Sequence, residues 1–462
     1  MTPVHVLILA AGEGKRMHSL LPKVLHPAAG LPLVVHVTRA AVELRPASLH
    51  VVVPRESAEV FRQQLRPYPA TCVVQDPPAG TADAVAVGCK AIGETRGSLL
   101  VINGDCPGIR PSTLTALLER HGDAAATCLV VRPDEPAGYG RIVRDHQGNL
   151  HHIIEEADAS EEELAIGEVN GGVYCFDLAS LRNVLVSVGQ DNVKGEYGLP
   201  DAFRLLRESV GHVGVFEHGD AEEVHGVNTR AELARAEALL HRRVLSALME
   251  AGVTVRHPCS TFVDVDVTVG ADTVLYPGIM LEGDSVIGAG CTLYPNVRVA
   301  ASRIGDSVTL LDGSVIEDST VGDGATIGPY ARLRPGSDIG PRVRLGNFVE
   351  TKATRIGAGS KAGHLSYLGD ADIGDSVNVG AGTITCNYDG QRKYKTIIED
   401  GAFIGSNTAL VAPVRVGANA YVGAGSTITE DVPEDALSLA RGRQTNKKGW
   451  ASRRRASKKV DT

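Results

Sequence analysis

The sequence predicts two domains of different classes, an α/β domain over residues 1–229 and a parallel β-helix over residues 251–440, with a connecting helix over residues 230–250. In the first half, short runs of β-branched residues alternate with amphipathic stretches. In the second half, an aliphatic residue followed by glycine recurs with a period near six. The chain has 462 residues, which is longer than one hydrophobic core normally accommodates, so more than one domain is expected.

The first half alternates predicted strands with predicted helices. The predicted strands are Val4–Leu9, Leu49–Val53, Thr71–Val74, Ser98–Ile102, Thr127–Val131 and Val169–Phe176. Helices are expected at Leu33–Leu44, Ala82–Ile92 and Ser112–His121. This alternation predicts a Rossmann-like, mostly parallel sheet covered by helices. Ligands of such sheets lie at the carboxyl ends of the strands, where we therefore expect the chemistry.

Residues 229–250 predict one long helix between the two domains. Thr229 is a plausible N-cap, apolar residues then recur at spacings of four and seven, and Gly252 ends the segment. The domain boundary is expected to run through this helix.

The second half carries a hexapeptide repeat that begins near residue 265. Aliphatic–glycine pairs run from Val269-Gly270 to Val422-Gly423, and nearly all spacings are multiples of six or one residue short. Three hexapeptides make one triangular coil, whose aliphatic residues stack on those of the next coil. The low aromatic content of 4% suits such a fold. The repeat resembles the hexapeptide class that forms left-handed β-helices. These folds are an exception to the rule that crossover connections are right-handed.

The repeat is interrupted between residues 379 and 404. The polar segment Thr385–Thr396 does not fit a hexapeptide, so one coil is expected to extrude a loop there. Insertions in a solenoid lie on one face and are often functional.

Composition excludes several classes of function. The net charge is −9, yet residues 441–462 hold nine Lys or Arg and one acid, so the first 440 residues are strongly acidic. This argues against extensive nucleic-acid binding. No apolar run is long enough for a membrane helix, and no secretory pattern is present. The eight cysteines include no CxxC pair, which favours a reduced, cytoplasmic protein without a zinc site. Within the basic tail, Ser452–Thr462 is predicted to be disordered.

A glycine-rich turn directly after the first strand predicts a phosphate-binding loop. In the segment LAAGEGKRM, Gly12 and Gly14 let backbone amides approach an anion, and Lys15, Arg16 and the later Lys23 supply positive charge. No Ser or Thr follows the lysine, which excludes a P-loop, and Met17 replaces the third glycine of a dinucleotide motif. The combination is typical of sugar nucleotidyltransferases.

Two oxygen-bearing residues predict a magnesium site near this loop. Asp105 follows the strand Ser98–Ile102, and Asn228 lies just before the connecting helix. Mg²⁺ takes few protein oxygens and keeps waters and substrate phosphates as its other ligands. Asp105 alone is equally explained as a turn or cap residue, and Asn228 alone is better explained as a turn residue, so the prediction rests on the pair.

A histidine in the β-helix predicts a second site. His364 lies in the segment AGHLSYLGD, at an expected turn between coils and one coil before the extruded loop. Acyl transfer from a thioester to an amine needs a base to accept the amine proton, and imidazole is well suited to this role.

Taken with these motifs, the chain resembles bacterial bifunctional N-acetylglucosamine-1-phosphate uridyltransferase / glucosamine-1-phosphate acetyltransferases over residues 4–450. The resemblance is carried by LAAGEGKRM, PKVLH, GYGRI, EVNGG, GVN, ARLRPG, NFVETK, SKAGHLSYLGD and AGTITCNYDG. It implies acetyl transfer from acetyl-CoA to glucosamine-1-phosphate, then uridyl transfer from UTP to give UDP-N-acetylglucosamine and pyrophosphate. It also implies Mg²⁺ as cofactor, a cytoplasmic homotrimer, and a product used in cell-wall peptidoglycan synthesis.

The resemblance also implies roles for individual residues. Those expected to bind the nucleotide and sugar are Leu9, Ala10, Ala11, Gly12, Arg16, Lys23, Gln75, Gly80, Thr81, Gly104, Asp105, Gly140, Glu155, Asn170 and Asn228, with Asp105 and Asn228 as the metal ligands. In the second site, His364 is expected to be the general base. The expected ligands of the amino-sugar phosphate are Arg334, Lys352, Tyr367 and Asn378. Those of acetyl-CoA are Ala381, Asn387, Tyr388, Ser406, Ala424 and Arg441, between neighbouring subunits.

Two departures from the family pattern fall at the base pocket, where Asn103 replaces a usual Tyr and Ala82-Asp83 a usual Gly-His. Two alternatives remain. One is a sugar-nucleotide pyrophosphorylase whose β-helix serves only oligomerisation or regulation, and the other is a binding scaffold with an inactive catalytic domain. The segments around His364 and Asn387 argue against the first alternative, and the presence of Lys23, Asp105, Asn228 and His364 argues against the second.

Overall fold

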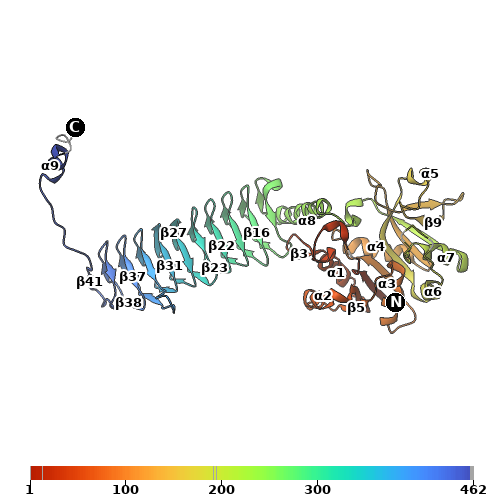
Figure 1. Cartoon of the computed structure of the whole chain (residues 1–462), viewed down its shortest axis with the longest axis horizontal. Coiled ribbons are helices and arrows are strands. Elements are labelled where there is room, and N and C mark those ends of the chain that lie inside the picture. The colour runs from red at the N-terminus through yellow and green to blue at the C-terminus, as the bar shows by residue number, and fades with distance from the viewer. Residues whose placement is uncertain (1, 13, 191, 194, 458–462) are drawn as a thin grey trace. The chain divides into compact units, whose positions relative to one another are not determined.

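The computed structural model describes residues 2–12, 14–190, 192–193 and 195–457 (Figure 1). The chain divides into two compact units, Met1–Val244 and Leu245–Thr462. The division falls inside helix α8, Arg230–Glu250. The finer division of the chain into four segments, with boundaries at 229, 250 and 440, stays a prediction.

The first unit is built on one mixed sheet with strand order β11-β7-β10-β6-β1-β4-β5, and β8 and β9 extend it beside β10. Neighbouring strands are parallel, except that β10 runs antiparallel to β6, β7 and β8, and β8 antiparallel to β9. Most strands therefore point the same way, as predicted for a mostly parallel sheet, and β9 and β10 run in the opposite direction. The strands are β1 (Val4–Leu9), β4 (Ser48–Pro54), β5 (Thr71–Gln75), β6 (Ser98–Asn103), β7 (Ala126–Val131), β8 (Arg141–Arg144), β9 (Leu150–Ile154), β10 (Val169–Asp177) and β11 (Val213–Glu217), beside the small pair β2 (Pro27–Ala28) and β3 (Leu31–Pro32).

Helices cover both faces of this sheet. They are α1 (Leu33–Glu43), α2 (Ala58–Leu65), α3 (Thr81–Ala91), α4 (Pro111–His121), α5 (Glu161–Leu164), α6 (Leu178–Leu185) and α7 (Asp201–Ser209), with 3₁₀ turns η1 (Lys15–Met17), η2 (Lys23–Leu25), η3 (Arg55–Ser57) and η4 (Ala221–Val224). Leu7 of β1 packs into a core with α3, α6 and α7, whereas its neighbours Val6 and Ile8 pack into a core with α1, α2 and α4. Burial on both faces explains why the strands are almost continuously apolar. It leaves the strand ends as the place for polar chemistry.

The N-terminus of α8 forms as the sequence predicts. Glu232 N donates to Thr229 Oγ1 at 3.2 Å, and Thr229 N donates to the Glu232 carboxylate at 2.8 Å, which is a capping box. Gly252 follows the helix with φ +94°, and its N–H donates to Met249 O. Among the described residues, no helix has both the length and the apolar character needed to cross a membrane.

The second unit is a left-handed β-helix with three faces of parallel strands. The first face contains β12 (Thr254–Val255), β15 (Val274–Leu275), β18 (Thr292–Leu293), β21 (Thr309–Leu310), β24 (Thr326–Ile327), β27 (Arg344–Asn347), β30 (Lys361–His364), β33 (Asn378–Val379), β36 (Phe403–Ile404), β39 (Tyr421–Val422) and β41 (Leu437–Ser438). The second face contains β13 (Phe262–Val263), β16 (Met280–Glu282), β19 (Arg298–Ala300), β22 (Val315–Glu317), β25 (Arg332–Leu333), β28 (Glu350–Lys352), β31 (Tyr367–Gly369), β34 (Ile384–Cys386), β37 (Ala409–Val411) and β40 (Thr427–Ile428). The third face contains β14 (Thr268–Val269), β17 (Val286–Ile287), β20 (Arg303–Ile304), β23 (Ser319–Val321), β26 (Ser337–Ile339), β29 (Arg355–Ile356), β32 (Ala371–Ile373), β35 (Thr396–Ile398) and β38 (Val414–Val416).

The aliphatic residue of each hexapeptide lies inside the coil, and the glycine after it makes room for the next coil. Ile287, Ile304 and Val321 occupy the same register in successive coils and are buried. A Cβ on Gly288 would lie 2.5 Å from Gly305 O and 2.5 Å from Asp306 Oδ1. The Asp306 carboxylate accepts a hydrogen bond from Ala289 N at 2.8 Å, so it closes the turn of the preceding coil. The stacking of coils therefore explains the aliphatic–glycine pattern.

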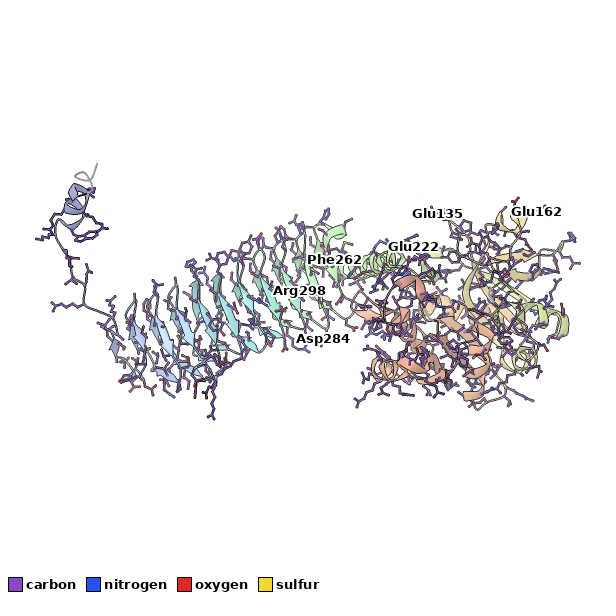
Figure 2. The ribbon with its side chains drawn as sticks, viewed as in Figure 1. Glu135, Glu162, Glu222, Phe262, Asp284 and Arg298 are labelled. Carbon is purple, nitrogen blue, oxygen red and sulfur yellow. The ribbon has the colours of Figure 1, made fainter. Side chains whose placement is uncertain are left out.

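Outward-facing side chains of the second face form lateral contacts between coils. Figure 2 labels Phe262 of β13 and Arg298 of β19 on this face. The Arg298 guanidinium donates to Glu282 at 2.6 Å and to Glu317 at 2.7 Å, and these hydrogen bonds raise its pKa. These carboxylates lie on β16 and β22, one coil before and one coil after, so the ladder of charges runs along the solenoid axis.

Two sequence-based boundaries are corrected by the structure. Thr385 belongs to β34 and Thr396 to β35, so the extruded loop spans only residues 387–395, because both threonines still pair with neighbouring coils. The disorder predicted for Ser452–Thr462 is wrong up to Ser457, where helix α9 (Trp450–Ser457) ends. The Arg454 guanidinium lies 5.5 Å from the Trp450 ring, four residues away, which supports this helical turn. Residues 458–462 lie outside the described residues.

The inward position of the hexapeptide predicts where the solenoid is sensitive to mutation. Ile339 of β26 is 1% exposed, whereas the adjacent Asp338 points outward. We expect Ile339→Ala to lower the free energy of unfolding of the β-helix by about 3 kcal/mol, because it leaves a cavity in a stack that cannot collapse. Asp338→Ala should change it by less than ~0.5 kcal/mol. Urea denaturation followed by circular dichroism measures both values, and equal effects would contradict the assigned orientation of β26.

Candidate active sites

The predicted phosphate loop lies at the carboxyl edge of the central strands. Gly104 N donates to Leu9 O at 2.8 Å, and Ala10 N donates to Val52 O at 2.8 Å. The segment Leu9–Gly12 therefore runs beside Gly104 and Asp105, which follow β6. Ala10 and Ala11 are buried, whereas Gly12 is exposed at the rim, where its backbone is accessible to a ligand. The predicted Glu13 of this motif lies outside the described residues.

A glycine brings the loop against Lys23. Gly14 has φ +63°, and a Cβ there would lie 2.5 Å from Lys23 Cβ. Any larger residue at position 14 would push the lysine away and would be strained in this backbone conformation. Gly14 thus forms the turn of the loop and also lets the Lys23 side chain lie against it.

Lys23, Asp105 and Asn228 converge although they are far apart in sequence. The Lys23 ammonium forms an ion pair with Asp105 Oδ2 and donates to Asn228 Oδ1 at 2.9 Å. The Lys23 and Asp105 side chains are only 12% and 16% exposed, so their mutual attraction is weakly screened. A carboxylate and an amide oxygen that share one cation are a donor set suited to Mg²⁺, and the ammonium marks where such a cation would lie. The two predicted metal ligands therefore fit the ion.

Arg16 does not join this group. It lies in the exposed turn η1, and its guanidinium makes no hydrogen bond or ion pair within the described parts of the chain. The sequence places it near the loop, but the side chain itself extends into solvent.

The segment expected to read the base is held by its own hydrogen bonds. Gln75, at the end of β5, donates through Nε2 to Gly80 O at 3.2 Å and to Asp83 Oδ2 at 2.6 Å. Gly80 has φ +123° and lies against the backbone of Tyr197, and Thr81 Oγ1 accepts from Leu199 N at 2.9 Å. Residues 75–83 and 197–199 are thus joined by hydrogen bonds and close contacts into one rim.

Three of the four residues expected to contact the sugar and ribose, Gly140, Glu155 and Asn170, lie together beside β8 and β10, whereas the fourth, Gly104, lies beside the phosphate loop. Asn170 N donates to Gly140 O at 2.9 Å, and a Cβ on Gly140 would lie 3.6 Å from both Asn170 Cβ and Glu155 Oε1. Asn170 is buried, and its amide is fixed by Tyr174 Oη at 2.8 Å and by Gly172 N at 3.0 Å. The departure Asn103 faces this region, because a Cβ on Gly172 would lie 2.5 Å from its Nδ2.

His364 ends β30 and is exposed at the corner between the first and second faces. Its Nδ1 lies 2.6 Å from Oδ1 of Asn347, which is the parallel partner of His364 on β27. An amide oxygen only accepts hydrogen bonds, so the ring donates through Nδ1, and in the neutral imidazole Nε2 then carries the lone pair. This is the arrangement that a general base requires.

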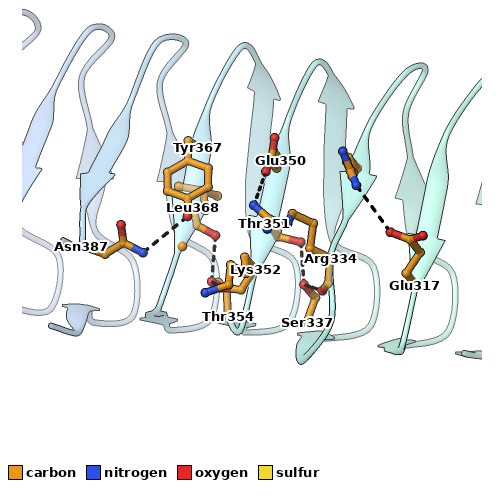
Figure 3. Close-up of polar contacts among 12 residues, drawn as sticks. Glu317, Arg334, Ser337, Glu350, Thr351, Lys352, Thr354, Tyr367, Leu368 and Asn387 are labelled. Atoms are coloured by element: carbon orange, nitrogen blue, oxygen red, sulfur yellow. Dashed lines mark hydrogen bonds and ion pairs between the residues drawn. The ribbon is translucent and has the colours of Figure 1, made fainter. Parts of the chain in front are cut away.

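Positive charges gather at the opposite edge of the second face, between it and the third face. Arg334 donates to Glu350 at 3.0 Å (Figure 3), and Lys352 lies 3.8 Å from Asp370. Lys393, from the extruded loop, lies near Lys352, and its amine lowers the pKa of Lys352. Two lysines and an arginine held this closely are suited to a phosphate dianion. A hollow of about 230 Å³ beside them is lined by Ala353, Asp370, Lys393, Tyr394 and Lys395.

The extruded loop is tied to the same edge. Asn387 Nδ2 donates to Tyr367 Oη at 3.4 Å (Figure 3) and to Asp370 at a shorter distance. Tyr388 Oη donates to Gly390 O at 2.6 Å, which closes the tip of the loop. Tyr367, Asn387 and Tyr388 are therefore brought to the positive cluster.

The remaining predicted ligands stand elsewhere. Ala381, Ser406 and Ala424 stack in the column of turns above His364, where Asn407 N donates to Ala381 O and Gly425 N to Ser406 O. Arg441 joins this column through a 2.7 Å hydrogen bond to Ala424 O. Asn378 lies on the first face, between its partners on β30 and β36. Apart from Asn378, one chain therefore presents the predicted ligands at two corners, separated by the width of the second face, about 10 Å for three residues.

Three residues with evident structural roles were missed in the sequence. Asn347 stands 17 residues before His364, so counting one coil back would have found it. Lys393 was part of the extruded loop, and its charge in that loop was a usable signal. Asp83 was noted as a departure, but its contact with Gln75 could not be read from the sequence.

Comparisons with known proteins find family matches in both units. Residues 6–217 match the MobA-like NTP transferase domain, residues 265–295 the hexapeptide repeat of succinyl-transferase, and residues 395–430 the bacterial transferase hexapeptide (six repeats). The chain is 46% identical to the bifunctional protein GlmU of Geobacillus sp. over 455 residues, which is 98% of each chain. It is 45% identical to that of Listeria monocytogenes over 460 residues, 99% of this chain and 100% of the relative. It is also 44% identical to that of Shouchella clausii over 449 residues, 97% of this chain and 98% of the relative. Since the likeness extends across both units, the chain belongs to the family of the bifunctional protein GlmU.

Proposed function

We propose that the two units catalyse successive steps in the synthesis of UDP-N-acetylglucosamine. The β-helix transfers the acetyl group of acetyl-CoA to glucosamine-1-phosphate, and the α/β unit then transfers the uridyl group of UTP to the product. Membership of the GlmU family supports both activities. The observation that carries the first-unit assignment is the convergence of Lys23, Asp105 and Asn228 at the carboxyl edge of the sheet.

Uridyl transfer needs positioning and charge rather than a general base. The sugar phosphate oxygen is already an anion, and it attacks the α-phosphorus of UTP while the bond to pyrophosphate breaks. Backbone amides after Leu9 and the Lys23 ammonium stabilise charge on the phosphates. Asp105 and Asn228 would hold Mg²⁺, which would supply further neutralisation of the triphosphate charge. Gln75, Gly80 and Thr81 line the base, and Gly140, Glu155 and Asn170 line the sugar.

Acetyl transfer uses the free nitrogen of His364. As the sugar 2-amine adds to the thioester carbonyl, Nε2 accepts the amine proton, and the CoA thiolate leaves when the carbonyl re-forms. Asn347 keeps the proton on Nδ1 and so keeps Nε2 basic. Arg334, Lys352, Tyr367 and Asn378 bind the amino-sugar phosphate, and we add Lys393 to this set because it lines the hollow beside Asp370, the ion-pair partner of Lys352.

A homotrimer would complete the acetyl-transfer site. Acetyl-CoA is assigned to Ala381, Ser406, Ala424 and Arg441 at one corner of the prism, and to Asn387 and Tyr388 at the other. If a neighbouring copy places the corner that carries its Asn387 and Tyr388 against the corner that carries Ala381, Ser406, Ala424 and Arg441 of this chain, the two sets of ligands come together. We assign the enzyme to the cytoplasm, where UTP and acetyl-CoA are available, and the eight free cysteines agree with a reducing compartment.

A coupled assay tests the proposal. Purified protein with acetyl-CoA, glucosamine-1-phosphate, UTP and Mg²⁺ should release CoA thiol first and pyrophosphate after a lag, because the second step consumes the product of the first. Supplying N-acetylglucosamine-1-phosphate should remove the lag. Release of pyrophosphate without thiol would indicate a uridyltransferase with a purely structural β-helix. If neither thiol nor pyrophosphate is released, both proposed activities are refuted.

A further inference from the structure

The amide of Gln75 is oriented by its surroundings. Both of its hydrogen bonds to protein are donated by Nε2, to Gly80 O at 3.2 Å and to Asp83 Oδ2 at 2.6 Å. A carbonyl and a carboxylate only accept hydrogen bonds, so the opposite amide orientation would set oxygen against oxygen. Gln75 is 2% exposed, which makes such a mismatch expensive. Its Oε1 is therefore directed away from Gly80 and Asp83.

Asp83 is the stronger of the two acceptors. Gly80 O already accepts the helical hydrogen bond from Ala84 N at 3.1 Å, so it is shared. Asp83 lies in the first turn of α3, where the helix dipole favours a negative charge. The hydrogen bond from Gln75 Nε2 to the Asp83 carboxylate is 0.6 Å shorter than the one from Gln75 Nε2 to Gly80 O, as expected for an ionised acceptor.

We propose that Asp83 is a positioning residue that turns Oε1 of Gln75 toward the nucleobase and so makes the pocket select a base with a ring N–H. The inference rests on the proposed function, in which Gln75 lies at the base. Uracil presents N3–H, which Oε1 accepts. Cytosine has a lone pair at N3, and two acceptors would then face each other in a buried site.

Two variants of Asp83 separate its hydrogen bond from its charge. Asp83→Asn removes the charge but keeps an oxygen that accepts from Nε2, whereas Asp83→Ala removes both. We expect Asp83→Ala to raise the KM for UTP about tenfold with little change in kcat, and to lower the preference for UTP over CTP about tenfold. Asp83→Asn should keep both values within about threefold of the wild type. Steady-state pyrophosphate release with each nucleotide measures these values.

Further variants provide the controls. Glu59→Ala removes an acid from the first turn of helix α2, which packs on the other face of the sheet, and should leave the UTP preference unchanged. Gln75→Ala should reduce the preference by itself, and adding Asp83→Ala to it should have no further effect, because Asp83 acts through Gln75. Circular dichroism of each variant checks that its α/β unit is folded.

The outcomes are distinguishable. If Gln75→Ala changes the preference and Asp83→Ala does not, the proposal for Asp83 is wrong, and the assigned base site stands. If Asp83→Asn behaves like Asp83→Ala, charge rather than hydrogen-bond acceptance is responsible, which also overturns the proposal. If Gln75→Ala changes neither KM nor preference, the base does not lie at Gln75, and the assigned base site fails together with this inference.

Discussion

Replacing His364 with alanine should lower acetyl transfer about 10³-fold and leave uridyl transfer within twofold of the wild type. The variant loses the nitrogen that accepts the amine proton, a contribution of about 10²- to 10⁴-fold in general-base catalysis. The rate of CoA thiol release at saturating acetyl-CoA and glucosamine-1-phosphate measures the loss. Pyrophosphate release from UTP and N-acetylglucosamine-1-phosphate, on the same preparation, measures the other site.

His257 offers a matched control for this variant. It is an exposed histidine of the same unit, and its Nδ1 also has a partner, Ser260 Oγ at 2.8 Å. His257→Ala should leave both activities unchanged. Added imidazole should restore part of the activity of His364→Ala, since it supplies the missing base. Acetyl transfer above a tenth of the wild-type rate would remove His364 from proton transfer, and loss of both activities would indicate collapse of the assembly instead.

Replacing Asp105 with asparagine should lower uridyl transfer about 10³-fold while acetyl transfer persists. The isosteric change removes the negative charge that shares a cation with Asn228, and loss of one preorganised electrostatic group costs about 10²- to 10³-fold. Electron paramagnetic resonance of Mn²⁺, used in place of Mg²⁺, should show weakened metal binding in the same variant. Asp134→Asn, an exposed acid of the same unit, serves as the control.

Lys23→Gln separates the roles of the two charges. The Lys23 ammonium contacts both oxygens that are assigned to the metal ion, one from Asp105 and one from Asn228. Removing this ammonium should therefore lower uridyl transfer but leave Mn²⁺ binding unchanged or tighter. Weaker Mn²⁺ binding in Lys23→Gln, or full uridyl transfer in Asp105→Asn, would contradict the assigned arrangement.

Much of the β-helix could be predicted because its fold is local and periodic. Each coil repeats the same requirement, an inward aliphatic followed by a residue without a side chain, as Ile287-Gly288 and Ile304-Gly305 illustrate. The interruption after residue 379 was visible for the same reason. The tail helix α9 was missed because a basic segment without apolar periodicity resembles a disordered one.

The strand β10 shows where the α/β unit could not be predicted fully. Its residues Val169–Asp177 are all but continuously buried, as in a parallel strand, yet it runs antiparallel to both β6 and β7. Burial on both faces determines the apolar character of a strand, but strand direction depends on the connections, which local patterns do not contain.

The sequence by itself determined the two fold classes, the phosphate loop after β1 and the family to which the motifs point, since each depends on neighbouring residues or a short period. Only the tertiary structure decided which side chains act together. Lys23 meets Asp105 and Asn228, which lie 82 and 205 residues away. Asn347 sets the proton on His364 from the preceding coil, and Asp83 turns the amide of Gln75. These contacts depend on distances and hydrogen-bond directions to a few tenths of an ångström, which arise only when separate elements pack against one another.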